Sequence, residues 1–326
     1  MKKNVIVTGG AGYIGSHACK ALKKSGYNPI TIDSLSTGWS DSVKFGPLEK
    51  INLLDLEKLN EVFQKFEPLS VMHFAAFSQV EESIKEPEKY WLNNLVGSLN
   101  LIRTAILNNC LNFVFSSTCA TYGDQDGVLL NESTPQNPKN AYGASKMAVE
   151  QMLHQFALSS GLKYVIFRYF NVAGADPDGE IGEFHLPETH LIPIVLDTIL
   201  GKRDFITIYG TDYETHDGTC IRDYVHVCDL VDAHILGMKD LTLKGMNKIY
   251  NLGTGKGFSV REVIEHTQKI TNKDILVKKG DRRPGDCTKL VSSSLLIQKE
   301  LGWKPLRSNL DEIIKDAWRW HKTGQY

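Results

Sequence analysis

The chain has 326 residues, of which 42% are hydrophobic and 23% are charged. These fractions are typical of a globular protein, so they exclude a disordered, collagen-like or coiled-coil chain. The 37 basic and 38 acidic residues give a net charge of -1, which offers no electrostatic reason to expect a nucleic-acid or membrane partner. We therefore expect a folded protein that holds any anionic ligand through a local site.

The cysteines and the N-terminus bear on the cellular compartment. Six cysteines are spread along the chain without a CxxC pair, which argues against a zinc ribbon and against a disulfide framework. The apolar run at residues 5–7 is too short for a signal peptide or a membrane span. We expect a cytoplasmic protein, because that reducing compartment suits free thiols.

The first half of the chain alternates short apolar runs with longer amphipathic stretches. The runs predict strands at residues 5–8, 29–33, 71–74, 113–117 and 165–170. The stretches repeat apolar residues at three and four positions, which predicts helices at 12–24, 55–66, 87–109 and 141–160. This alternation predicts an α/β fold, a Rossmann-like, doubly wound parallel sheet with helices on both faces. Its ligand crevice would lie at the carboxyl ends of the strands.

The alternation stops after Phe170, where residues 171–193 are rich in Gly, Pro, Asp and Glu. We place a domain boundary there. Residues 1–171 form the Rossmann-like domain, to which some later segments return, and residues 172–326 form mainly a smaller, mixed α/β domain. In the second domain we predict helices at 191–200 and 228–241, and strands at 206–209 and 223–226. Ser259 and Glu262 form a capping-box pattern that starts another helix.

Three glycines, Gly9, Gly12 and Gly15, lie between the first predicted strand and the first predicted helix. In a dinucleotide site they permit a tight turn, the approach of a pyrophosphate and close packing of the helix. Asp33 ends the second strand, where a carboxylate accepts the hydroxyls of an adenosine ribose. A glycine-rich turn with a capping aspartate is the alternative. Since residues 34–38 contain no Arg or Lys, the pattern favours NAD over NADP.

Tyr142 and Lys146 are four residues apart at the start of a predicted helix, so they share one face. A free tyrosine has a pKa of about 10, and a nearby cation favours its phenolate, as the positive nicotinamide ring of bound NAD also would. Thr118 follows a strand at the expected crevice. Such a pair alone is common on helix surfaces, and Ser116 to Thr118 alone are typical of a turn. Together and in this order they indicate a base that removes the proton of an alcohol while NAD accepts the hydride.

The motifs TGGAGYIG (8–15), HFAA (73–76), SST (116–118), YGASK (142–146) and RYFNVAG (168–174), together with Asp33, resemble the extended short-chain dehydrogenase/reductase family. The resemblance runs nearly end to end. The stretches YGTDY (209–213), DGTCIRDYVHV (217–227), NLGTG (251–255) and RRPGD (282–286) are similar to the sugar-nucleotide 4-epimerases of that family.

The resemblance implies a redox-neutral isomerase with tightly bound NAD. Such enzymes interconvert UDP-galactose and UDP-glucose by oxidising C4 and returning the hydride to the other face. It implies that Tyr142 takes the 4-hydroxyl proton, that Lys146 lowers the pKa of Tyr142 and holds the nicotinamide ribose, and that Thr118 bonds the same hydroxyl. It implies no metal. The implied NAD contacts are Gly9, Gly12, Tyr13, Ile14, Gly15, Asp33, Leu53, Phe74, Ala75, Ala76, Asn93, Ser116, Tyr142, Lys146 and Tyr169.

The implied contacts of the UDP-hexose are Thr118, Asn171, His190, Leu191, Tyr209, Arg222, Arg283 and Asp286. The guanidinium groups of Arg222 and Arg283 suit the diphosphate, because they pair bidentately with phosphate oxygens. A surface ion pair is the alternative for each arginine. Helices 87–109 and 141–160 are those with which relatives form a homodimer, although their apolar stripes could equally face their own sheet.

Some positions depart from the family. Asn52, Ser78 and His190 stand where relatives often carry Asp, Lys and Asn. Leu290 aligns with a position that limits the group at sugar C2, so a UDP-N-acetylglucosamine 4-epimerase is an alternative. A 4,6-dehydratase or a UDP-glucuronate decarboxylase is another, but Cys119 and Ala120 replace the Asp-Glu pair that the dehydratases usually carry after the threonine. A non-catalytic NAD(H) sensor is less consistent with an intact Tyr142 and Lys146.

Overall fold

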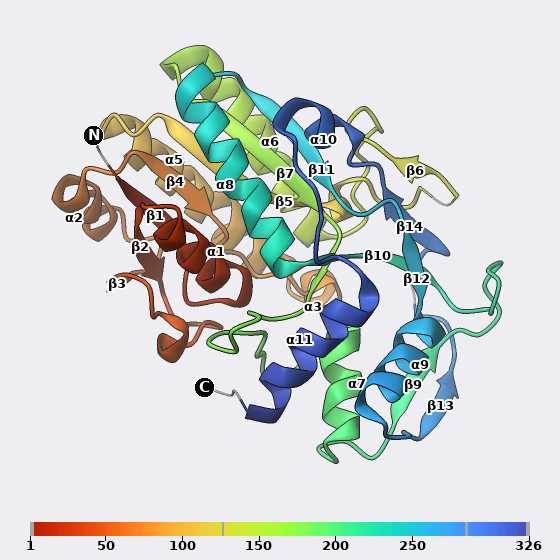
Figure 1. Ribbon diagram of the computed structural model, residues 1–326. Helices are drawn as coiled ribbons and strands as arrows, with labels where there is room; N and C mark the ends of the chain where they lie inside the picture. The colour runs from red at the N-terminus through yellow and green to blue at the C-terminus, as the bar shows by residue number, and fades with distance from the viewer. Residues whose placement is uncertain (1–2, 126, 284–285, 324–326) are drawn as a thin grey trace. The chain divides into compact units, whose positions relative to one another are not determined.

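The computed structural model describes residues 3–125, 127–283 and 286–323 (Figure 1). The chain separates into two compact units. The first comprises residues 1–123, 133–169 and 231–250, and the second comprises residues 124–132, 170–230 and 251–326. Among the described residues, no helix combines the length and the apolar character that crossing a membrane requires.

A seven-stranded sheet forms the centre of the first unit. Its strand order is β11-β7-β5-β4-β1-β2-β3, and the neighbouring pairs from β7 to β3 are all parallel. The order reverses beside β1, which is the switch point where doubly wound sheets bind ligands. The strands are β1 (Asn4–Thr8), β2 (Asn28–Asp33), β3 (Leu48–Lys50), β4 (Ser70–His73), β5 (Asn112–Thr118), β7 (Lys163–Tyr169) and β11 (Lys248–Leu252).

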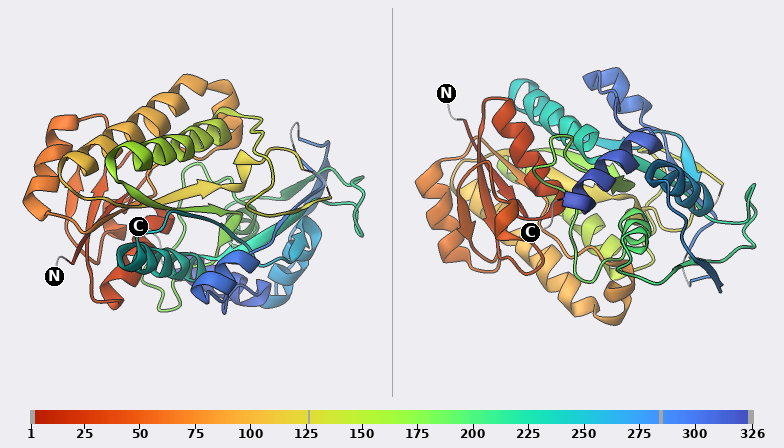
Figure 2. Two further views of the ribbon diagram at one scale, coloured as in Figure 1. Left: turned by 90° about the horizontal axis from the view of Figure 1, so that it is seen from above. Right: turned by 60° about the horizontal axis from the view of Figure 1, so that its bottom comes forward.

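Helices cover both faces of this sheet. Buried side chains of α2, α5 and α6 form one core with Ile6, Phe113 and Ile166. On the other face Gly237 of α8 packs against Val165 and Phe167, because neighbouring residues of a strand point to opposite faces. Figure 2 shows α5 and α6 on one side and α8 on the other. The helices are α1 (Tyr13–Lys24), α2 (Leu56–Phe66), α3 (Val80–Lys85), α4 (Pro87–Tyr90), α5 (Gly97–Leu107), α6 (Ala141–Ser160) and α8 (Val227–Lys244).

The predicted doubly wound α/β fold is confirmed, and the five predicted strands of the first half are present with ends shifted by one or two residues. The prediction of one helix over 87–109 needs correction, because a π-helical turn, Trp91–Val96, separates α4 from α5. Asn94 lies buried in that turn, and its side chain exchanges two hydrogen bonds with the backbone of Phe77. π-helical turns are frequent at functional sites, and this one carries Asn93.

The second unit contains two smaller sheets. The order of the five-stranded sheet is β12-β10-β14-β6, with β8 paired to β10, and β13 pairs with β9. The capping box at the start of α9 is confirmed, because Ser259 and Glu262 exchange both bonds. The elements are β6 (Leu129–Leu130), β8 (Asn171–Ala173), α7 (Leu191–Ile199), β9 (Ile206–Tyr209), β10 (Ile221–His226), β12 (Gly257–Ser259), α9 (Val260–Thr271), β13 (Val277–Gly280), β14 (Lys289–Ser292), α10 (Leu295–Leu301) and α11 (Leu310–Thr323). Two 3-10 turns in the first unit, Ser40–Ser42 and Cys119–Thr121, complete the assignment.

Candidate active site

The glycine turn joins β1 to α1 and has no room for side chains. Gly9 has φ +74, and a Cβ there would lie 2.6 Å from the backbone nitrogen of Ala75. A Cβ on Gly15 would lie 2.0 Å from the carbonyl oxygen of Gly9, so only glycine lets α1 pack against the turn. At Gly12 the turn is less crowded, because an added Cβ would make one tight contact, 3.3 Å from the carbonyl oxygen of Gly9. Because α1 begins directly after Gly12, its first backbone N–H groups are suited to an anion.

Asp33 ends β2 and is tied to the same turn. Its Oδ2 accepts a hydrogen bond from the backbone N–H of Ala11 at 3.0 Å, and its Oδ1 accepts one from Leu35 at 2.8 Å. Burial raises the pKa of Asp33, although the two N–H groups act in the opposite direction. Each carboxylate oxygen retains a lone pair for a ribose hydroxyl. The open glycine cradle and this fixed carboxylate therefore fit a dinucleotide.

The other residues predicted to contact the cofactor belong to the same unit. Most lie at or after the carboxyl end of a strand of the seven-stranded sheet, which is the edge that binds ligands. Leu53 follows β3, Phe74 to Ala76 follow β4, and Ser116 and Tyr169 lie near the ends of β5 and β7. Tyr13 and Ile14 start α1, and Asn93 lies in the π-helical turn. Two departures from the family, Asn52 and Ser78, are exposed. The contacts themselves stay predictions.

Tyr142 lies buried in the first turn of α6. The helix starts at this point because the Asn140 side chain accepts a hydrogen bond from the Gly143 backbone. Burial raises the pKa of Tyr142, Tyr169 adds to the increase, and a hydrogen bond from Thr118 opposes it. Burial thus dominates the pKa of Tyr142, because moving a phenolate out of water costs free energy. The expectation that Lys146 favours the phenolate stays a prediction.

Lys146 is buried one helical turn after Tyr142. Its Nζ donates a hydrogen bond to the carbonyl oxygen of Ser116 at 2.8 Å and lies 4.8 Å from the centroid of the Phe115 ring. Burial lowers the pKa of Lys146 to about 7, although the Glu150 carboxylate acts in the opposite direction. The amine is therefore held near the end of β5. Because its pKa is close to neutral pH, a nearby charged group can change its protonation state.

A buried ion pair connects α6 to the sheet. Arg168 of β7 pairs with Glu150 of α6, with Nη2 and Oε2 separated by 2.5 Å and both side chains 5% exposed. The Ser117 hydroxyl also donates to Glu150. Glu150 lies one turn after Lys146, so this pair fixes the segment of α6 that carries both Tyr142 and Lys146.

Two arginines, an aspartate and a tyrosine predicted to hold the substrate come together in the second unit. Arg222 of β10 donates to the carbonyl oxygens of Ile221 and Cys287 and lies 3.4 Å from Asp286. The other oxygen of Asp286 lies 3.0 Å from Nε of Arg283. The guanidinium of Arg283 lies 5.2 Å from the ring centroid of Tyr209. The cluster therefore presents two cations and an aromatic ring; Pro284 and Gly285 of the same motif lie outside the described residues.

The remaining substrate candidates lie on neighbouring elements of this unit. Asn171 of β8 is paired with Tyr224, two residues along β10 from Arg222. Leu290 of β14 is paired with Arg222 itself. His190 occupies the position just before α7, where its side chain makes no capping hydrogen bond, and Leu191 is the first residue of the helix. The structure places the His190 ring against Glu183 and Glu188, at 2.9 and 3.0 Å.

The sequence argument assigned no role to two buried histidines of the first unit. His73 connects Thr8 and Ser98 through its two ring nitrogens, at 2.6 and 2.7 Å. Burial lowers the pKa of His73 well below its usual value, so the ring is neutral. His234 of α8 lies 3.1 Å from the Ser116 hydroxyl, and its ring centroid lies 5.0 Å from that of Phe74. His73 belongs to the HFAA motif, which could have indicated it from the sequence. No sequence motif around His234 indicates a role for that residue.

Comparisons with known proteins identify similar chains. Residues 5–253 match the NAD dependent epimerase/dehydratase family. The chain is 46% identical over 318 residues to a UDP-glucose 4-epimerase of Rhizobium meliloti (strain 1021), covering 98% of this chain and 97% of that one. It resembles the crystal structure of a UDP-glucose 4-epimerase from Brucella ovis in complex with NAD, with TM-score 0.95, 45% identity and 97% of each chain covered. The enzyme from Bifidobacterium longum, in complex with NAD+ and UDP, has TM-score 0.91, 32% identity and 98% coverage of each chain.

Proposed function

The chain belongs to the NAD-dependent epimerase/dehydratase family, and on that premise we propose that it interconverts UDP-galactose and UDP-glucose with bound NAD. The observation that carries the proposal is the arrangement in the first unit. There the buried phenol of Tyr142 is bonded by Thr118 and followed after one turn by Lys146. The relatives with 42–46% identity over nearly the whole chain are UDP-glucose 4-epimerases, which supports the same reaction.

We propose that the first unit binds NAD and the second unit binds the nucleotide part of the substrate. The glycine turn and Asp33 would hold NAD, which would supply the acceptor for the hydride of C4 and the donor for its return to the opposite face. Tyr142 takes the proton of the 4-hydroxyl group and gives it back, while Thr118 holds the same oxygen. Lys146 supplies a cation beside the ribose and the phenol.

The substrate must be held by its nucleotide rather than by its sugar, because the oxidised hexose has to rotate between the two hydride transfers. Arg222 and Arg283 suit this task, since two guanidinium groups bind the diphosphate through charge-assisted hydrogen bonds. Asp286 keeps both guanidinium groups oriented, and Tyr209 offers a ring beside the uracil. Asn171, His190 and Leu191 complete the proposed contacts of the sugar nucleotide.

Purified protein, with the NAD that it retains, is expected to convert UDP-galactose into UDP-glucose without added NAD. Proton NMR of the anomeric signals measures the conversion directly and needs no coupling enzyme. Folded, NAD-loaded protein that leaves both sugars unchanged would contradict the proposal. In the same experiment, UDP-N-acetylgalactosamine tests the space beside Leu290, and a 4-keto-6-deoxy product would indicate the dehydratase alternative.

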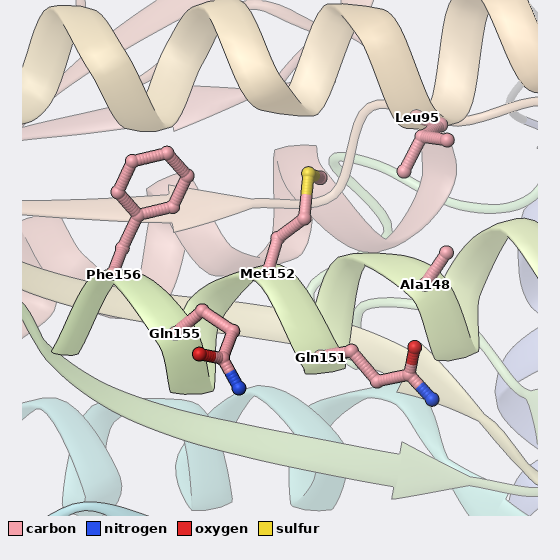
Figure 3. A pocket seen from close by; sticks show the side chains of 6 residues that line it. All are labelled: Leu95, Ala148, Gln151, Met152, Gln155 and Phe156. Atoms are coloured by element: carbon pink, nitrogen blue, oxygen red, sulfur yellow. The ribbon is translucent and has the colours of Figure 1, made fainter. Parts of the chain in front are cut away.

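We propose that the protein is a homodimer in which the π-helical turn Trp91–Val96 and the side of α6 that carries Met152 and Phe156 contact a second copy. An open pocket of about 470 Å³ is lined by Leu95, Ala148, Gln151, Met152, Gln155 and Phe156. Figure 3 shows Leu95 pointing toward α6, and Met152 and Phe156 rising from α6 toward the neighbouring helix. Trp91, Leu92 and Val96 nearby are 38–48% exposed. A clustered apolar surface of this kind supports association.

Met152→Glu is expected to convert the dimer into a monomer, because the interface would bury an unpaired charge. Sedimentation velocity at micromolar concentration measures the change. Leu243→Glu is the matched control, since Leu243 is 85% exposed on α8 and lies outside the pocket. A wild-type monomer at these concentrations would contradict the proposal, as would a Met152→Glu dimer.

A cytoplasmic location is also proposed. None of the six cysteines, all within the described residues, takes part in a disulfide, which supports a reducing compartment.

A further inference from the structure

Two glutamates and two histidines converge in the segment between β8 and α7. They are Glu183, His185, Glu188 and His190, and one ligand atom from each lies within 4.8 Å of the other three. The His190 Nδ1 atom lies 2.9 Å from Glu183 and 3.0 Å from Glu188, and the His185 Nδ1 atom lies 3.4 and 3.6 Å from the same two carboxylates. Both imidazoles thus direct the same ring nitrogen toward the same pair of carboxylates.

These separations match those of a four-coordinate zinc site. Zinc binds imidazole nitrogen and carboxylate oxygen at about 2.0–2.2 Å, so neighbouring ligands of a tetrahedral ion lie about 3.3–3.6 Å apart. The four nitrogen–oxygen distances here range from 2.9 to 3.6 Å, with His185 and His190 facing different oxygens of the Glu188 carboxylate. Small side-chain shifts would therefore admit an ion at the centre. The donors are also the appropriate class, because imidazole and carboxylate together suit zinc better than magnesium or calcium, which prefer oxygen ligands alone.

The backbone that carries the four side chains is held in place at both ends. A Cβ on Gly182 would lie 2.3 Å from Cγ of Trp320, so the chain rests directly on that indole, whose Nε1 donates to the Glu183 carbonyl oxygen at 3.0 Å. The Glu188 carboxylate accepts hydrogen bonds from the backbone N–H groups of Thr189 and His190, both at 2.8 Å. Such supporting bonds orient metal ligands in known sites.

Two features distinguish the cluster from ordinary surface ion pairs. The Glu183 side chain is only 4% exposed, and a buried carboxylate requires compensation. The Nδ1 atom of His185 is buried and makes no hydrogen bond within the described parts of the chain. A dication bound by two neutral imidazoles would balance the negative charges of both carboxylates and would bind the Nδ1 atom of His185. The half-exposed ring of His190 leaves a route for the ion.

We propose that Glu183, His185, Glu188 and His190 form a binding site for one Zn²⁺ ion per chain, with tetrahedral geometry. The site is structural: it joins the loop to the first turn of α7, because His190 immediately precedes that helix. The site shares His190 with the proposed contacts of the sugar nucleotide, but its test measures metal binding by the folded protein and so does not depend on the proposed reaction. The alternative is that the four groups form only imidazolium–carboxylate ion pairs, and the experiment separates the two.

The test uses untagged, NAD-loaded protein that has been treated with a chelator and exchanged into metal-free buffer. Calorimetric titration with ZnCl₂ is expected to give one site per chain with micromolar or tighter affinity, while MgCl₂ gives no stoichiometric binding. Addition of Co²⁺ as a spectroscopic substitute is expected to produce the intense visible absorption of a tetrahedral site. Absence of stoichiometric zinc binding, or a weak octahedral Co²⁺ spectrum, would overturn the proposal and leave ion pairs only.

Variants locate the site. His185→Gln and Glu183→Gln are each expected to weaken Zn²⁺ binding by at least about 10-fold, because even loss of a residue that only supports a metal ligand costs about 10–100-fold. His216→Gln is the matched control, because His216 also lies beside two carboxylates, at 3.8 and 3.5 Å, in the same unit. Circular dichroism and retained NAD verify folding. Unchanged affinity in folded His185→Gln would assign the zinc to another place and reject this one.

Discussion

Tyr142→Phe is expected to lower the turnover number for UDP-galactose by about 100-fold or more, the usual scale for removal of a general base. The aromatic ring is retained, so we expect the packing of α6 and the glycine turn that would bind NAD to be unchanged. Only the hydroxyl that Thr118 bonds is lost. Steady-state kinetics should therefore show a fall in kcat with the NAD content of the purified protein unchanged.

Tyr164→Phe provides the control for a buried tyrosine that lacks a catalytic role. Tyr164 lies near the start of β7, away from the carboxyl end of the sheet, and its hydroxyl is 3.4 Å from His154. This variant should retain kcat within a factor of about two, because only one long and weak hydrogen bond is lost. A Tyr142→Phe enzyme with a near-normal rate would remove Tyr142 from the mechanism. Loss of NAD from that variant would instead indicate a binding role.

Arg168→Met is expected to lower the free energy of unfolding by about 3–5 kcal/mol, because it leaves the buried Glu150 carboxylate without its cation. Both side chains are 5% exposed, so solvent cannot replace the lost partner. Urea unfolding of NAD-saturated protein, followed by circular dichroism, measures the change. Since Glu150 lies one turn after Lys146, we expect kcat to fall in this variant as well.

Two further variants make this prediction specific. Arg103→Met removes an exposed arginine of α5 and should change the free energy of unfolding by less than about 0.5 kcal/mol. Glu150→Gln combined with Arg168→Met removes both charges and should recover a large part of the loss. If Arg168→Met unfolds at the wild-type urea concentration, the ion pair does not stabilise α6 on the sheet.

The turn that would receive the dinucleotide is an example of a site that local sequence defines. Gly15 is required because a side chain there would meet the backbone of Gly9, six residues earlier, whereas Gly9 is required because it packs against the backbone of Ala75 after β4. Asp33 is fixed by N–H groups of Ala11 and Leu35, both close to the strands that were predicted from apolar runs. The substrate cluster is different. Arg222 and Asp286 are 64 residues apart in the sequence, and they lie close together because β10 pairs with β14. No local sequence pattern predicts that pairing.

The sequence by itself determined the fold class, the sheet edge and the residue types at it, because strand and helix periodicity and glycine sterics act over a few residues. The tertiary structure alone decided how those groups ionise and what surrounds them. Burial lowers the pKa of Lys146 to about 7 and raises that of Tyr142, the opposite of what a solvated pair would show. The tertiary structure also places His234, on a helix distant in the sequence, beside Ser116. Desolvation and long-range packing are properties of the whole assembled core, and a single stretch of sequence does not contain them.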